Sequence, residues 1–186
     1  MSYVEQLSGG HTNSLGNTVA VVNDVLAHPG RLEELYGCYF ADDATVRLRT
    51  SNAMKRIAAA RPELLLPYLD RLLGEVSLLE QSSAQWTLAQ LLLTYTDELT
   101  QSQLATAKEL LKHNLGQSSD WIVLIQTATT LAEWAGEDQE LNDWLIPQLL
   151  SLENDTRKAV SRRATKLLAS MLTDYPPHTI IQQRNN

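Results

Sequence analysis

Apolar and polar residues recur along this chain with the period of an amphipathic α-helix, and no stretch shows the strict alternation of a strand. The helical pattern covers residues 14–27, 31–40, 43–60, 62–75, 82–97, 101–115, 119–135, 139–151 and 155–173. Prolines and most glycines fall at or near the joints, where they start or end helices. The pattern predicts an all-α protein whose short joints make consecutive helices antiparallel neighbours.

The apolar pattern also repeats at long range. The leucine pairs Leu72-Leu73, Leu110-Leu111 and Leu149-Leu150 follow one another at a nearly constant spacing. This spacing is close to the period of about 40–47 residues of HEAT and armadillo repeats and exceeds the roughly 34 of tetratricopeptide repeats. It predicts helix pairs stacked one on the next.

Three short stretches make the likeness more specific. Residues 65–69 (Leu-Leu-Pro-Tyr-Leu) and 145–149 (Leu-Ile-Pro-Gln-Leu) resemble the proline-containing second helix of a HEAT repeat, and residues 43–47 (Asp-Ala-Thr-Val-Arg) resemble the opening of its first helix. Over about residues 31–172 the chain therefore resembles HEAT-like, armadillo-type helical repeat proteins. The resemblance implies a right-handed α-α superhelix of about four helix pairs with a terminal capping helix. It says little about function, because members include adaptors, scaffolds, transport receptors, bilin lyases and alkylpurine DNA glycosylases.

The predicted domain organisation is simple. Residues 14–173 are expected to form one repeat domain, with an N-terminal segment (1–13) and a C-terminal tail (174–186) outside the regular stack. No apolar run reaches the ~20 residues needed to span a bilayer and no secretory signal is visible, so a cytoplasmic location is expected. Cys38, the one cysteine, lies in an apolar stretch and is expected to fill the core.

The repeat register predicts which polar residues face outward. On the helix 43–60, Arg49, Asn52 and Arg56 lie on the flank of the apolar face. One repeat later, the equivalent positions in the helix 82–97 are Thr87, Gln90 and Thr94, joined by Ser83. One further repeat later, in the helix 119–135, they are Gln126, Thr129 and Glu133. We expect all of these residues to be exposed.

The last helix continues this row with a basic strip of Lys158, Arg162 and Lys166. Lys and Arg number 15 and Asp and Glu 22, for a net charge of -7, yet residues 154–173 carry five basic and one acidic side chain, a net +4 that leaves -11 on the remainder. Two interpretations stay open. The strip is either the solvated outer face of a capping repeat or a docking site for an acidic partner.

The sequence shows no constellation that would carry out a reaction. Its four histidines are scattered, and neither a phosphate-binding loop nor a nucleophile motif is present, so neither a metal nor a cofactor is expected. Trp86 and Trp121 are assigned to the core, whereas Trp134 or Trp144 is a candidate for lining a surface groove.

These observations favour a non-catalytic protein-interaction module or scaffold that binds an extended or acidic protein. One candidate surface is formed by the second helices and offers Glu63, Asp70, Arg71, Glu109, Lys112 and Asp143. The alternative is an enzyme of the same fold acting on nucleic acid, or a bilin-lyase-like protein. Nucleic acid is disfavoured because the cations fall on first helices, and no membrane is expected as a partner. The candidate partner-binding residues are Lys158, Arg162, Lys166, Arg49, Arg56 and Trp144.

Overall fold

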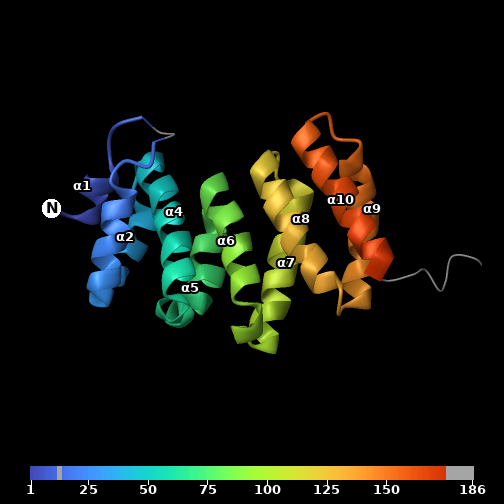
Figure 1. The fold of residues 1–186 in the computed structure, drawn as a ribbon, viewed down its shortest axis with the longest axis horizontal. Coiled ribbons are helices and arrows are strands. Elements are labelled where there is room, and N and C mark those ends of the chain that lie inside the picture. Colours follow the sequence, from blue (N-terminus) through green and yellow to red (C-terminus); the bar gives the residue numbers. More distant parts are fainter. Residues whose placement is uncertain (12–13, 175–186) are drawn as a thin grey trace, which may run out of the picture.

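The computed structural model describes residues 1–11 and 14–174, and within these ranges all regular secondary structure is helical (Figure 1). The α-helices are α1 (Tyr3–Leu7), α2 (Thr18–Ala27), α3 (Leu32–Gly37), α4 (Ala44–Ala60), α5 (Leu69–Gly74), α6 (Ser82–Thr94), α7 (Gln101–Gln117), α8 (Trp121–Ala135), α9 (Gln139–Glu153) and α10 (Lys158–Asp174). Short 3-10 helices span Pro29–Arg31, Cys38–Phe40, Pro62–Leu64, Leu66–Tyr68, Val76–Leu78 and Thr96–Glu98. The predicted all-α class is confirmed.

Side chains at the joints set where the long helices begin. Asp43, Asp120 and Asp138 each precede a helix and accept hydrogen bonds from backbone N–H groups of its first turn. These N–H groups have no partner within the helix, so the caps satisfy them and favour these starting points. At α7, Thr100 and Gln103 form a reciprocal capping box.

One expected helix is broken. The segment 62–75 was predicted to be continuous, but it forms two 3-10 turns before α5 begins at Leu69. Pro62 and Pro67 each occupy the first positions of one turn. Proline lacks an N–H donor and clashes with the preceding turn, so the second proline, following closely on the first, prevents one α-helix from running through both.

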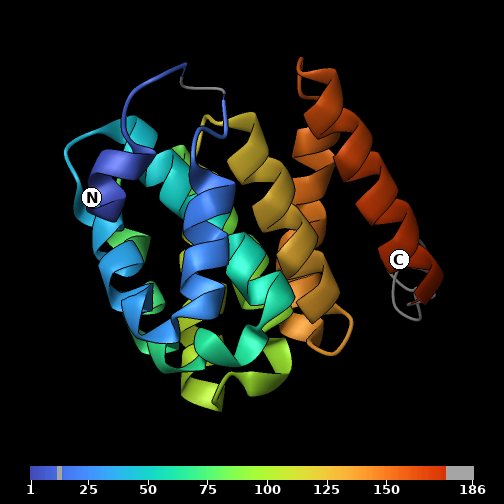
Figure 2. The same cartoon turned by 60° about the vertical axis from the view of Figure 1, so that its left-hand side comes forward.

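The helices lie in two layers. Helices α2, α4, α6, α8 and α10 pack side by side, each against the next, and we call them the first layer. The second helices, including α5, α7 and α9, pack behind them, with α7 against α8 and α9 against both α8 and α10. The views in Figures 1 and 2 both place the N-terminal helices and α10 at opposite ends of the array.

The first layer repeats with a nearly constant register. Helices α4, α6, α8 and α10 begin at Ala44, Ser82, Trp121 and Lys158, so successive starts are almost evenly spaced along the chain. Equivalent positions are buried in all four: the third (Val46, Ala84, Val123 and Val160), and the fourteenth counted from each helix start (Ile57, Trp134 and Met171, with Tyr95 directly after the end of α6). The period read from the leucine pairs is therefore present in the structure.

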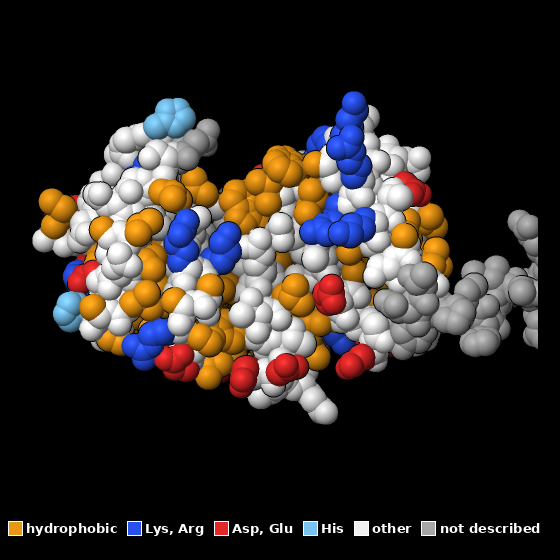
Figure 3. Space-filling model, viewed as in Figure 1, with side chains coloured by type: hydrophobic (Ala, Val, Ile, Leu, Met, Phe, Trp, Pro, Cys, Tyr) orange, Lys and Arg blue, Asp and Glu red, His pale blue; other side chains and the backbone are white. Residues whose placement is uncertain are grey.

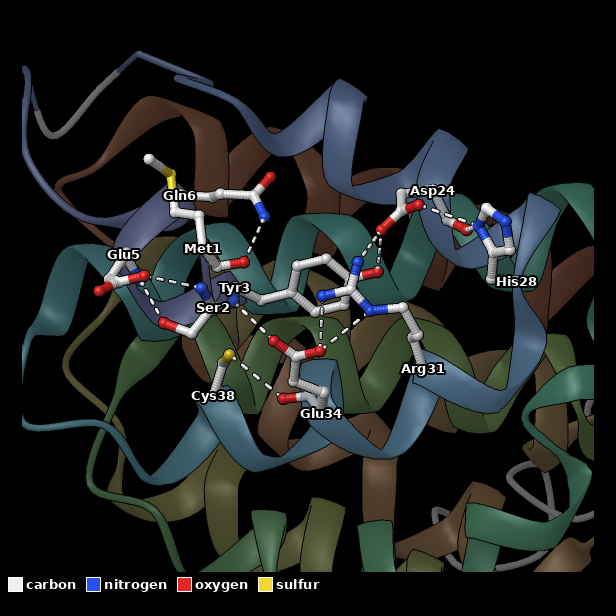
Figure 4. A network of polar contacts seen from close by, with 10 residues as sticks. All are labelled: Met1, Ser2, Tyr3, Glu5, Gln6, Asp24, His28, Arg31, Glu34 and Cys38. Carbon is white, nitrogen blue, oxygen red and sulfur yellow. Dashed lines mark hydrogen bonds and ion pairs between the residues drawn. The ribbon is translucent and has the colours of Figure 1, made fainter.

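The N-terminal segment departs from its expected place outside the stack. Tyr3 and Leu7 of α1 are fully buried in the same core as the repeats. The polar contacts in Figure 4 fasten this helix: the Tyr3 hydroxyl donates to Asp24 at 2.7 Å, and Arg31 forms ion pairs with both Asp24 and Glu34. The hydrogen bond from Tyr3 holds the pKa of the Asp24 carboxyl below its ordinary value. The expected boundary at residue 14 is wrong, because α1 packs on the first helix pair.

Two further predictions concern Cys38 and the C-terminal tail. Cys38 is 1% exposed and its thiol donates to the Glu34 carbonyl, so its assignment to the core is confirmed. Burial raises the pKa of this thiol to about 11. The C-terminal tail was predicted over residues 174–186; residue 174 ends α10, and residues 175–186 lie outside the described residues.

Candidate partner-binding face

Two rows of side chains run across the outward side of the first layer. One consists of Asn52, Gln90, Thr129 and Lys166, which are half-buried apart from the exposed Lys166, and the other consists of Arg56, Thr94, Glu133 and Ser170, all of which are exposed. Both occupy equivalent positions in α4, α6, α8 and α10. The exposure predicted for Arg56, Thr94 and Glu133 is confirmed, whereas the row of Asn52, Gln90 and Thr129 is less exposed than predicted. We call this surface the outward face.

The third predicted row is covered on α4 and α6, whereas its member on α8, Gln126, is half-buried. It begins with Arg49 and Thr87, which are 2% and 1% exposed. Ser83, one turn earlier on α6, is also buried. A helical wheel fixes the angle between side chains but not the angle at which the neighbouring helix packs, and here the neighbour covers the flank.

Arg49 illustrates this most clearly. Its guanidinium donates to the carbonyl oxygens of Leu7, Ser8, Gly9, His11 and Ser14, with distances from 2.7 to 3.3 Å. The side chain thus organises the segment between α1 and α2. The prediction that Arg49 contacts a partner is wrong, because its donors are used inside the protein.

Of the seven other cations of the first layer, Arg47 donates to Gln81 and to the Ala41 and Asp42 carbonyls, and the remaining six form no ion pair among the described residues. Lys55 and Arg56 on α4 and Lys158, Arg162, Arg163 and Lys166 on α10 take part in no ion pair within the described chain. All but Arg163 are exposed. Arg56 donates only to the neutral amide of Asn52, at 2.7 Å. These side chains are free to meet an external anion.

Cations elsewhere in the described residues are used differently. Six of them form ion pairs with carboxylates: Arg31, Arg61, Arg71, Lys108, Lys112 and Arg157. Arg71 lies 2.8 Å from Glu33, and Lys108 lies 2.7 Å from Asp138. On the second helices, which were an alternative candidate surface, the positive charges are therefore already neutralised within the protein.

The charge of the chain is consequently divided between the layers. Helices α4, α6, α8 and α10 together contain eight Lys and Arg against Glu133 and Asp174, a net +6. The whole chain carries -7, so everything outside these four helices sums to -7 - 6 = -13. These four helices are net positive within an acidic protein, and opposite charges attract most effectively where they are segregated in this way.

The tryptophans also differ from expectation. Trp121, assigned to the core, is 47% exposed, because it is the first residue of α8 and lies at the open end of the helix. Trp86, also assigned to the core, is half-buried. Trp134, a candidate for a surface groove, is 6% exposed and donates its indole N–H to Thr96.

The structure separates the predicted site residues into three places. Lys158, Arg162 and Lys166 lie together on α10, Arg56 lies on the same layer at α4, and Arg49 is buried. Trp144 belongs to the second layer, where the Lys112 ammonium lies 5.5 Å from its ring centroid. Sequence reasoning missed Lys55, although it is adjacent to Arg56 and its helix contains no acidic residue.

Figure 3 shows how these groups are arranged. On the face that it views, one group of Lys and Arg side chains lies over the α4 side and another over α10, with hydrophobic side chains between them. Neither α6 nor α8 contains a Lys or Arg. The outward face thus has two basic ends and an uncharged middle, apart from Glu133.

Two further questions about the described residues are whether they could bind a metal ion and whether they could cross a membrane. Among them, no group of three or more His, Cys, Asp or Glu side chains could hold a metal ion. No helix in these ranges is long and apolar enough to cross a membrane. Comparison with known proteins found no matching family model, no matching curated protein and no matching solved structure.

Proposed function

We propose that the protein is a non-catalytic interaction module that binds an acidic protein partner on its outward face. The observation that carries this proposal is the segregation of unpaired cations on α4 and α10, while the cations of the second layer are neutralised by carboxylates. Unpaired cations form no ion pair that could stabilise the protein's own fold, and they are therefore available to a partner.

The repeating architecture supports the same proposal. A right-handed HEAT-like superhelix of four helix pairs, α2 with α3, α4 with α5, α6 with α7 and α8 with α9, followed by α10 as a cap, would account for the even spacing of the first-layer helices along the chain. Stacked repeats create long continuous surfaces suited to extended partners. The capping interpretation of α10 and its docking role are compatible, because a polar outer face can serve both.

A retention experiment tests the proposal. The tagged protein is incubated with extract of its source cells, and retained proteins are compared between the wild type and Lys158→Ala/Arg162→Ala/Lys166→Ala. The matched control, Gln101→Glu/Ser102→Glu/Thr106→Glu, changes the net charge by the same amount at exposed positions of α7. The proposal predicts a stoichiometric protein kept by the wild type and the control and lost by the α10 variant. Equal retention by all three proteins would remove the outward face as the binding site.

A further inference from the structure

The two basic ends of the outward face are far apart. Lys55 and Arg56 lie on α4, and Lys158, Arg162 and Lys166 lie on α10, with α6 and α8 between them. Packed helices are separated by about 8–10 Å, so three steps from α4 to α10 span roughly 25–30 Å. A partner must reach across this distance to meet both ends.

The middle of the face offers apolar contact. Trp86 and Ile125 occupy equivalent positions on α6 and α8, and both are half-buried. Trp121 begins α8 and is 47% exposed. Aromatic side chains with part of the ring in solvent are enriched at the centres of protein interfaces, where they contribute much of the binding energy.

A nucleic acid strand fits this pattern poorly. Its phosphates follow one another at intervals of about 3.4 Å along a duplex strand, so cations are needed along the whole path. Helices α6 and α8 supply none and place Glu133 on the face. Phosphates crossing the middle would lie on an uncharged surface beside a carboxylate.

We infer that the partner segment is a protein chain with acidic side chains at both ends and apolar side chains in its middle, seated across α4, α6, α8 and α10. The inference rests on the proposed function and adds the order in which acidic and apolar side chains follow one another along the partner. At a rise of about 1.5 Å per residue, a helical segment spanning this distance needs about 17–20 residues, whereas an extended one needs about 8–9.

Synthetic peptides long enough to span the face as a helix test the order of charge. The first has acidic residues at both ends and apolar residues in the middle, and the second has the same length and composition with every acidic residue at one end. Labelled oligothymidylate serves as the nucleic acid probe, a polyanion whose bases can also stack on aromatic side chains. Binding is measured by fluorescence anisotropy at low salt to the wild type, to Lys55→Ala/Arg56→Ala and to Lys158→Ala/Arg162→Ala.

The two-ended peptide is expected to bind more tightly than the other probes and to lose affinity by about ten-fold with each double variant. The one-ended peptide should be sensitive to one variant only. Trp121→Ala should weaken binding of the two-ended peptide. Equal affinity for the two peptides, absence of measurable binding by the two-ended peptide, or tighter binding of oligothymidylate would overturn the inference.

The retention experiment distinguishes failure of the two-ended partner from failure of the proposed function. If the natural partner is lost with the α10 variant but kept with Lys55→Ala/Arg56→Ala, the protein binds an acidic partner at one end only. The proposed function then stands and the two-ended partner is refuted. If the partner is kept by both variants, both conclusions fall.

Discussion

Arg49 on α4 donates a hydrogen bond to the backbone carbonyl of Leu7, far earlier in the chain, at 2.7 Å. This contact, with four more from the same guanidinium, joins the end of α1 to the repeat array. A cation predicted to bind a partner thus stabilises the N-terminal segment.

Replacing Arg49 should therefore destabilise the fold. We expect Arg49→Leu to lower the free energy of unfolding by about 2–4 kcal/mol, because several charge-assisted hydrogen bonds are lost, including the buried one to the Leu7 carbonyl. Arg56→Leu, an exposed position on the same helix, should change it by less than about 0.5 kcal/mol. Urea denaturation measures both, and similar values for the two variants would show that the carbonyl contacts contribute no net stability.

Gly16 is constrained by the same side chain. Its φ is +50°, and a Cβ added there would lie 2.8 Å from the Arg49 Cζ. We expect Gly16→Ala to cost about 1–3 kcal/mol through backbone strain and displacement of the guanidinium. Gly30→Ala is the control, because nothing lies within 4 Å of its added Cβ. A thermal melt in which both alanine variants match the wild type would contradict this account of the loop.

The tryptophans of α8 should differ sharply in their effect on stability. Trp134→Ala empties a buried site and removes the hydrogen bond to Thr96, so we expect a loss of about 3–5 kcal/mol. Trp121→Ala should cost less than about 1 kcal/mol because half of its surface is already in solvent. Chemical denaturation of the two variants checks the order, which would be reversed if Trp121 belonged to the core.

Acid should weaken the joint before α10. The ion pair with Arg157 lowers the pKa of the Asp155 carboxyl from 3.8 to about 2. The carboxyl is a stronger acid in the folded state, so its stabilisation is complete above about pH 5 and is lost as the pH falls through 3.8 toward 2. The stability difference between the wild type and Asp155→Asn should therefore shrink between about pH 5 and pH 2. A difference that stays constant over this range would show that the ionised carboxylate is not the source.

Much of the fold could be predicted from the sequence because its signals are local. The apolar period, the helix caps and the spacing of the leucine pairs each depend on nearby residues, and the predicted helices 101–115, 119–135 and 139–151 match α7, α8 and α9 closely at both ends. The break before Leu69 was missed because an otherwise continuous apolar pattern hides the effect of two prolines.

The candidate site was only partly predictable because exposure depends on which neighbour covers each flank. Lys158, Arg162 and Lys166 were placed correctly, since the last helix has a single strongly apolar side. The burial of Arg49 depends on a segment from the start of the chain, and no local pattern shows that contact. Trp121 has an apolar side chain in an apolar helix, and only its position at the helix end exposes it.

Site-specific cross-linking tests most directly whether the outward face binds the partner. Cys38 is buried and burial raises its pKa to about 11, so a maleimide photo-cross-linker should react only with an introduced cysteine. Thr94→Cys places the reagent on the outward face at α6, and Ala105→Cys places it at an exposed position of α7. With the protein recovered in the retention experiment, we predict a cross-link from residue 94 and none from residue 105. A cross-link from residue 105 alone would place the partner on the second layer and contradict the proposal.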